Sequence, residues 1–304
     1  MNWQAHTAEP CELGESPFWH PQENLLYWVD IPGKKIQRSD ASLRQIESWA
    51  MPSEPGCIAP AANGGLVMAL RHGVFRAQHW GGPLQRIATL DYDPSRMRAN
   101  DGKCDSLGRF WIGTIDESRA AHDAALFCLD GRGGGTPTLS HKAGPATTAN
   151  GLAWSPDGRT LYWADTPAHL VWAWDFEPEG AVLSAQRVFA QFAPKPAAWQ
   201  FDQGGYRGRP DGATVDIGGN YWVAMFEGRR LCQFAPDGRL LSEIDTPLQC
   251  PTMPCFGGAD LGTLFVSSAR HHRSAAELSA FPLSGCLLSM GVAQTGLPVN
   301  FYRD

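Results

Sequence analysis

The stretch "LAWSPDGRTLYWAD", Leu152 to Asp165, consists of two short apolar segments joined by a polar turn. The turn contains Ser, Pro, Asp and Gly, whose backbones and short side chains favour tight reversals of the chain. The second segment is rich in aromatic residues, which are enriched in β-strands. The stretch therefore predicts a β-hairpin.

Similar hairpin patterns recur along the whole chain. They read "SPFWHPQENLLYWVD" from Ser16, "APAANGGLVMAL" from Ala59, "CDSLGRFWIGTI" from Cys104, "ATVDIGGNYWVAMF" from Ala213 and "FGGADLGTLFVSS" from Phe256. Successive turns lie 40 to 61 residues apart, and periods of about 40–50 residues with several strands each are typical of propeller blades. We therefore predict a single all-β domain over residues 1–304, a six-bladed β-propeller. A β-sandwich is the alternative, but it does not require a repeat at this spacing.

The widest gap between turns contains "FAPKPAAWQFDQGGYRGRP", Phe192 to Pro210, which we interpret as a loop inserted over one mouth of the central channel. No convincing amphipathic helix is found. Asp30 and Asp165, in "WVD" and "WAD", are expected to cap strands and to accept hydrogen bonds from backbone between blades.

Composition excludes several classes of partner. The formal net charge is −6 and no Lys/Arg cluster stands out, so there is no electrostatic basis for binding nucleic acid or an anionic membrane. The N-terminus lacks a secretory signal pattern, and the longest uncharged stretch is broken by Pro and Gly. The eight cysteines form no CxxC pair, which indicates reduced, buried thiols in a cytoplasmic protein. We expect a monomer or a small homo-oligomer.

Polar side chains recur just before the first strand of several repeats. They are Glu15, Asn100 with Asp101, Asn150 and Asp211. In a propeller these positions converge at one mouth of the channel. Oxygen donors gathered there would repel one another unless a cation lay between them, and carboxylate and amide oxygens suit hard ions. Asp or Asn before Gly is also a common turn former, so the prediction rests on the matched positions in different blades. His271 and His272 are expected to be surface or loop residues.

Five motifs carry a resemblance to a known family. "GESPFW", "NDGKCDSLGRFWIGT", "ANGLAWSPDGRTLYWADT", "PDGATVD" and "TGLPVNFYR" appear in this order along nearly the whole chain. They resemble the SMP-30/gluconolactonase/LRE (regucalcin-like) family, whose members are six-bladed propellers with one divalent metal in the channel, and many of which hydrolyse sugar lactones.

The resemblance implies roles for particular residues. Glu15, Asn150 and Asp211 match the metal ligands, and Asp211 also matches the general base. Arg98 and Asn100 match residues that hold the substrate's hydroxyl groups. The family's further substrate-binding acid aligns with Ser118 here. The neighbouring acids are Asp116 and Glu117, of which Glu117 is the candidate for that role.

We therefore expect metal-dependent hydrolysis of an aldono-1,4- or 1,5-lactone to the aldonic acid. Ca²⁺ is the favoured ion, with Zn²⁺, Mg²⁺, Mn²⁺ and Fe²⁺ as alternatives. Two other functions remain open at this stage. One is a different metal-dependent esterase or organophosphate hydrolase on the same scaffold, and the other is a non-enzymatic calcium-binding propeller.

Overall fold

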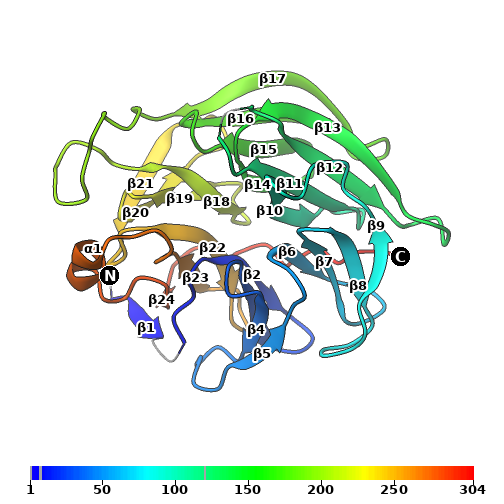
Figure 1. Cartoon of the computed structure of the whole chain (residues 1–304). Helices are drawn as coiled ribbons and strands as arrows, with labels where there is room; N and C mark the ends of the chain where they lie inside the picture. Colours follow the sequence, from blue (N-terminus) through cyan, green and yellow to red (C-terminus); the bar gives the residue numbers. More distant parts are fainter. Residues whose placement is uncertain (1, 7–8, 120) are drawn as a thin grey trace.

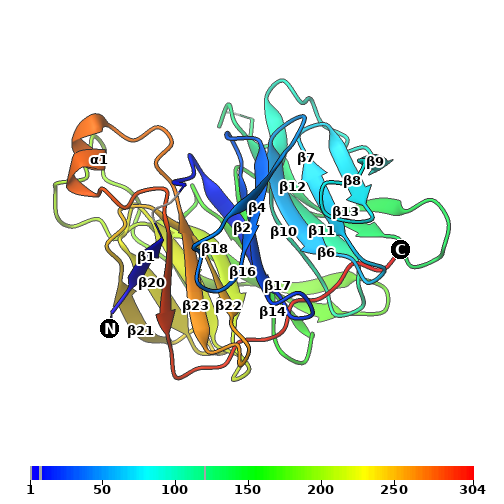
Figure 2. The ribbon, with the colours of Figure 1, turned by 90° about the horizontal axis from the view of Figure 1, so that it is seen from below.

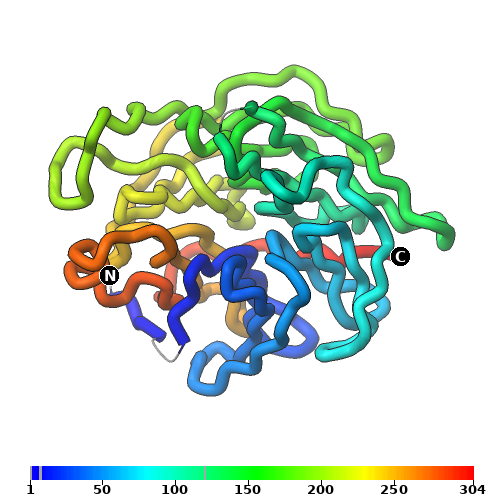
Figure 3. Tube along the Cα trace, viewed as in Figure 1, coloured from blue at the N-terminus to red at the C-terminus, as the bar shows by residue number. Residues whose placement is uncertain are grey.

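A computed structural model describes residues 2–6, 9–119 and 121–304. Its strands form six four-stranded antiparallel sheets arranged around a central channel (Figure 1). The chain passes from one sheet to the next around the ring, as the colour gradient of the tube shows (Figure 3). The six-bladed β-propeller expected from the repeats is confirmed, and the sandwich alternative is wrong.

Blades 1 to 5 each take four consecutive strands, ordered from the channel outward. Blade 1 contains β2 (Gly14–His20), β3 (Leu25–Asp30), β4 (Lys35–Ser39) and β5 (Glu47–Ala50). Blade 2 contains β6 (Pro55–Pro60), β7 (Leu66–Leu70), β8 (Gly73–Ala77) and β9 (Gln85–Ala88). Blade 3 contains β10 (Met97–Cys104), β11 (Phe110–Asp116), β12 (Ala124–Asp130) and β13 (Thr138–Ala146). Blade 4 contains β14 (Ala149–Trp154), β15 (Thr160–Asp165), β16 (Leu170–Glu177) and β17 (Val182–Gln191). Blade 5 contains β18 (Arg209–Val215), β19 (Tyr221–Phe226), β20 (Arg230–Phe234) and β21 (Leu240–Asp245).

Blade 6 closes the ring by combining the two ends of the chain. It contains β22 (Pro251–Gly257), β23 (Thr263–Ser268), β24 (Leu287–Gly291) and, as its outermost strand, β1 (Gln4–His6). Pairing of Gln4 with Ser289 joins the N-terminal strand to the last strand of the chain. This pairing links the first blade to the last without a covalent bond.

The repeated aromatic residues form the packing between blades. Trp28, Trp111 and Trp222 occupy the second strand of their blades and are among the largest fully buried side chains. Each indole N–H donates to a buried acceptor, as Trp111 and Trp222 do to the turn carboxylates of Asp105 (2.8 Å) and Asp216 (2.9 Å). The recurring turn acid therefore satisfies the polar atom of the recurring tryptophan.

Asp30 and Asp165 accept hydrogen bonds from the segments that lead into β2 and β14. The Asp30 carboxylate accepts from the backbone N–H of Leu13 at 3.1 Å, and Asp165 accepts from the N–H of Thr148 at 3.1 Å. Both segments connect one blade to the next, so the expected capping role is confirmed.

One short helix, α1 (Ala275–Ala280), was missed by the sequence analysis. It lies between β23 and β24, beside the wide connection between β17 and β18 (Figures 1 and 2). Phe281, which caps α1, packs edge-on against Phe201 of that connection. None of the helical residues that the structure describes forms a span long and apolar enough to cross a bilayer. All eight cysteines are free and buried, as expected.

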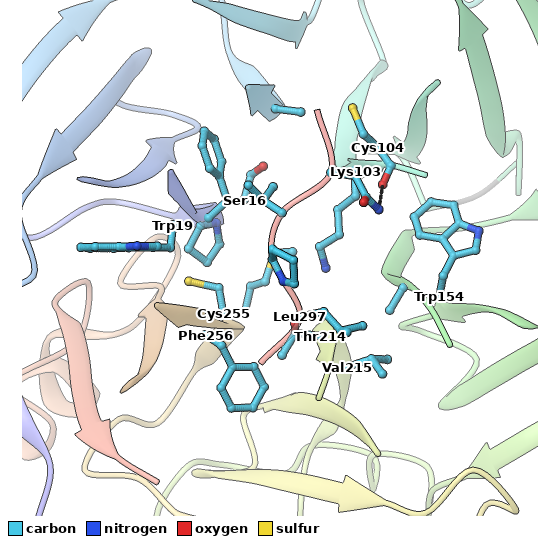
Figure 4. A pocket seen from close by; sticks show the side chains of 18 of the residues that line it. Ser16, Trp19, Lys103, Cys104, Trp154, Thr214, Val215, Cys255, Phe256 and Leu297 are labelled. Carbon is cyan, nitrogen blue, oxygen red and sulfur yellow. Dashed lines mark hydrogen bonds between the residues drawn. The ribbon is translucent and has the colours of Figure 1, made fainter. Parts of the chain in front are cut away.

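The C-terminal segment crosses one end of the channel. Gly296 bridges to Asp216 in blade 5, and Tyr302 bridges to Ala61 in blade 2. The segment closes a cavity of about 310 Å³ lined by the carboxyl halves of the inner strands, and Figure 4 shows it passing between Trp19, Trp154 and Phe256. Lys103 is the one charged side chain among the described residues of this wall. None of the described lining residues carries a carboxylate, so this cavity does not fit the expected chemistry.

Candidate active site

The inner strands all have a break in register at the same level of the channel. The breaks lie between Glu15 and Phe18, Pro55 and Cys57, Ala99 and Gly102, Asn150 and Ala153, Pro210 and Ala213, and Pro251 and Pro254. A β-bulge adds a residue to one strand and redirects the side chains beside it. The predicted site residues of blades 1, 3, 4 and 5 therefore lie at equivalent bulges.

Two of these bulges use the left-handed region of backbone conformation. Gly151, directly after Asn150, has φ of 62°, and Ser16, directly after Glu15, has φ of 50°. Glycine adopts this conformation without steric penalty, whereas serine is strained by about 1–2 kcal/mol. The backbone after each of these two polar residues turns sharply, which directs their side chains away from the regular strand pattern.

A cavity of about 820 Å³ opens at this mouth of the channel. Its wall includes the residues predicted as metal ligands, general base and substrate-binding groups: Glu15, Arg98, Asn100, Glu117, Asn150 and Asp211. Four of the six blades contribute to this set. Asp101, which was also expected at this mouth, does not line the cavity. The cavity at the other end of the channel shares no residue with this one.

A chain of buried hydrogen bonds holds three of these side chains. Arg98 Nη1 donates to Asn100 Oδ1 at 2.8 Å, and Asn100 Nδ2 donates to Asn150 Oδ1 at 2.7 Å. Asn150 Nδ2 in turn donates to the hydroxyl of Thr166 at 2.8 Å. Because each amide has a fixed partner on both sides, the orientation of the Asn150 amide in the cavity wall is fixed, with its oxygen facing Asn100.

Glu117 lies at the rim and pairs with two arginines. Its Oε1 accepts from Arg98 Nε at 3.2 Å, and its Oε2 accepts from Arg71 Nη1 at 2.9 Å. Asp116 points elsewhere, because it accepts from the backbone N–H groups of Ser118 and Ala121. Of the acids near this position, Glu117 is therefore the one that reaches the cavity.

Three buried carboxylates, those of Glu15, Asp211 and Asp101, act on one another's charge, and among the described residues none of them forms an ion pair. Burial, with the negative charges of Asp211 and Asp101, raises the pKa of Glu15 well above its usual range. Burial likewise raises the pKa of Asp211 to about 8, against the opposing charge of Arg209. Asp101 Oδ1 is buried without a hydrogen-bond partner among the described residues. Buried carboxylates so arranged cannot all ionise unless a positive charge is added.

Lys103 lies on the other side of Asp101. Its ammonium group donates to the backbone carbonyls of Leu152 (2.9 Å) and Ala213, and burial lowers its pKa while the charge of Asp101 opposes that shift. Lys103 thus joins the inner strands of blades 3, 4 and 5 beneath the site. Asp101 and Lys103 separate the polar cavity from the apolar one.

The same wall contains a second charged cluster that was not predicted from the sequence. Lys195, Arg209 and Arg273 surround the buried carboxylate of Glu227. The connection between β17 and β18 does reach this mouth, as predicted, since Lys195 lines the cavity. The clearest sign of this cluster in the sequence is the position of Arg209, two residues before the predicted site residue Asp211.

The two adjacent histidines also line the cavity. His271 and His272 were expected at the surface, and both are indeed partly or fully exposed, but they lie at the rim of this mouth. His271 lies 3.9 Å from the carboxylate of Glu12. The exposure of the two histidines was therefore predicted correctly, but their place in the cavity wall was not predicted.

The fold and this site define a class of protein. The family model described as the SMP-30/Gluconolactonase/LRE-like region matches residues 13–270, and the chain belongs to this family. It is 36% identical over 288 residues to a 6-deoxy-6-sulfogluconolactonase of Pseudomonas putida, covering 95% of this chain and 94% of that protein. It is 32% identical to a regucalcin of Danio rerio, covering 97% and 96% of the two chains.

A solved structure supports the fold independently. Regucalcin of Agrobacterium tumefaciens, named as a calcium-binding protein, superposes with a TM-score of 0.87 over 97% of this chain and 95% of that one, at 23% identity. The family and its named lactonase place this chain among hydrolases that act on ester bonds.

Proposed function

We propose that this protein hydrolyses a sugar lactone to the corresponding aldonic acid in a reaction that depends on a divalent metal ion. The observation that carries the proposal is the meeting of Glu15, Asn150, Asp211 and Arg98 in one cavity. These residues lie up to 196 positions apart in the chain. A relative of this chain is named as a 6-deoxy-6-sulfogluconolactonase. A gluconolactone with a sulfonate on carbon 6 is therefore one candidate substrate.

The donor set fits a hard divalent cation. Glu15 and Asp211 supply carboxylate oxygens and Asn150 supplies an amide oxygen, which are the ligand types of Ca²⁺, Mg²⁺ and Mn²⁺. The described residues contain no group of three or more His, Cys, Asp or Glu side chains with metal-holding geometry, which is consistent with a set whose third donor is an amide. A regucalcin named as calcium-binding shares the fold, and we favour Ca²⁺. When bound, the ion supplies Lewis-acid polarisation of the lactone carbonyl.

The residues of the chain divide the remaining tasks. Asp211 accepts a proton from the water that attacks the lactone carbonyl, a step that typically contributes about 10²–10⁴-fold. The proton passes to the ring oxygen as the ring C–O bond breaks, which gives the aldonic acid. Arg98 and Asn100 bind ring hydroxyls, and Glu117 fixes the Arg98 guanidinium by the pair at 3.2 Å. Glu15 and Asn150 mainly hold the ion.

A substrate panel tests this proposal. The purified protein with Ca²⁺ is expected to release acid from aldono-1,4- or 1,5-lactones at least about 100-fold faster than it hydrolyses a paraoxon-like phosphotriester. The reason is that the hydroxyl-binding side chains recognise a sugar ring. Acid release is followed with a pH indicator, after subtraction of spontaneous hydrolysis. Faster turnover of the phosphotriester would favour an organophosphate hydrolase, and metal binding without any turnover would favour a binding propeller.

Arg98→Ala is expected to raise KM for the lactone about 10-fold or more and to lower kcat less. Arg98 is buried, and its role in this proposal is to hold hydroxyl groups equally in substrate and transition state. Steady-state kinetics measure both constants. The matched control is Arg96→Ala, because Arg96 is partly exposed and pairs with Asp123 outside the cavity. An unchanged KM in Arg98→Ala would remove this residue from the substrate site.

A further inference from the structure

One buried carboxylate gathers three cationic side chains at the edge of the cavity. Glu227 accepts from Lys195 Nζ at 2.9 Å, from Arg209 Nη1 at 2.9 Å and from Arg273 Nη1 at 3.0 Å. Burial alone would raise the pKa of Glu227, but these neighbouring positive charges outweigh it and lower the pKa. Glu227 therefore stays ionised and holds three like charges close together.

The cluster has more donors than Glu227 can use. Two guanidinium groups and one ammonium group present about 13 N–H donors, whereas one carboxylate has about four lone-pair sites. Glu277 also pairs with Arg273, through Nε at 2.9 Å, but it does not line the cavity. Part of the donor capacity of the cluster is thus available to a second anion on the cavity side.

The charge of the whole wall is unusual for this chain. The described lining has six Lys or Arg side chains and five Asp or Glu side chains, although the chain as a whole carries a formal net charge of −6. Two of the five carboxylates, Glu15 and Asp211, are the proposed metal ligands. The rest of the wall is therefore strongly cationic, and such a cavity concentrates anions.

The three cations come from different segments and are held in place. Lys195 lies 5.1 Å from the ring of Trp199, whose ring packs at 5.1 Å against Tyr206, and the Tyr206 hydroxyl bonds to His169 at 2.9 Å. The guanidinium of Arg209 lies 5.0 Å from the ring of Phe226. These contacts fix the positions of the charges before any ligand binds, which favours binding.

The cluster is also next to the proposed chemistry. Arg209 is two residues before Asp211 on β18, and its charge acts on the Asp211 carboxyl. Two residues of extended strand span about 7 Å, so the cluster lies within reach of a substituent on a lactone held at Asp211. On the opposite wall Arg71 and Arg98 are already paired with Glu54 and Glu117.

We propose that Lys195, Arg209 and Arg273 form a subsite for a tetrahedral oxyanion, a sulfonate or a phosphate, carried by the substrate on the carbon farthest from the lactone carbonyl. Arginine forks match such groups through paired N–H donors. This inference rests on the proposed lactonase function and defines its substrate class as acidic sugar lactones.

The test compares neutral and acidic lactones. Wild-type protein is assayed on gluconolactone, 6-phosphogluconolactone and 6-deoxy-6-sulfogluconolactone, and kcat/KM for at least one acidic lactone is expected to exceed that for the neutral one about 10-fold or more. Lys195→Gln and Arg273→Gln are each expected to reduce this ratio about 10-fold. Comparison of the two acidic substrates distinguishes sulfonate from phosphate. Arg207→Gln is the matched control, because Arg207 belongs to the same connection but pairs with Glu243 outside the cavity.

Equal kcat/KM for neutral and acidic lactones would overturn the subsite while leaving the lactonase proposal intact. The subsite would also be overturned if Lys195→Gln and Arg273→Gln both left the ratio of kcat/KM for acidic over neutral lactone unchanged. If no lactone is turned over, the proposed function fails. Binding of the acidic and neutral products then tests whether the subsite exists. In that case 6-phosphogluconate must raise the Tm of the wild-type protein more than gluconate does, and equal shifts would overturn the subsite. This last measurement needs no variant, so it also applies if the substitutions prevent folding.

Discussion

Asp211→Asn is expected to lower kcat for lactone opening by about 10³–10⁴-fold while the propeller remains folded. The amide keeps an oxygen for a metal ion but cannot accept the proton of the attacking water. Activity is measured by acid release with saturating Ca²⁺, and folding by circular dichroism. Full activity of this variant with metal bound would refute the role of Asp211. Asp237→Asn is the matched control, since Asp237 is an exposed turn residue of the same blade.

The same substitution is expected to stabilise the protein in the absence of metal. Burial raises the pKa of Asp211 to about 8, above its usual value near 4 in an unfolded chain. The protonated form is therefore favoured in the folded state, and its contribution to stability is lost as the pH rises from about 4 through about 8. Asp211→Asn removes this loss, so its Tm in EDTA should exceed that of wild type by several degrees at pH 9 and by less at pH 5.

Removal of divalent ions is expected to abolish lactone opening, and readdition of a suitable ion is expected to restore it. Protein treated with EDTA is assayed after addition of Ca²⁺, Mg²⁺, Mn²⁺, Zn²⁺ or Fe²⁺ in turn. In the part of the chain that the structure describes, the carboxylates of Glu15 and Asp211 form no ion pair, so a bound cation supplies the missing charge. Undiminished turnover by protein shown to be metal-free would contradict the proposal.

Ion binding should also release about one proton per ion, because the raised pKa values of Glu15 and Asp211 leave the pair partly protonated at neutral pH. Calorimetry in two buffers of different ionisation enthalpy measures this number. Apparent affinity should rise as the pH increases through about 8. Glu15→Gln should weaken binding and reduce proton release, whereas Glu47→Gln, on the exposed outer strand of the same blade, should do neither.

Much of the fold could be predicted because its evidence is local. A strand, a turn and a second strand are encoded within about 15 residues, and six such hairpins at regular spacing are enough to predict six blades. The level of the site was also predictable, since Glu15, Asn150 and Asp211 stand at matched positions in their repeats. Closure of the ring by β1 was not, because pairing of Gln4 with Ser289 joins the two ends of the chain.

The rest of the site depends on contacts between distant blades. Nothing near Glu227 in the sequence shows that Lys195, Arg209 and Arg273 surround it, because those residues reach it from three different segments. The family pattern placed the substrate-binding acid at Ser118, yet Glu117 is the acid that reaches Arg98 and the cavity. Asp101 and Lys103 lie on one strand, and only the tertiary contacts show that the charge of Asp101 acts on Glu15 and Asp211 while Lys103 joins three blades.

The sequence by itself determined the repeat, and with it the six blades and the level at which their polar residues stand, because hairpin patterns act over a few residues. Only the tertiary structure decided which polar residues share a cavity and which charges lack a partner. Burial and distance set the energies of these groups, and both arise from parts of the chain that meet only after folding.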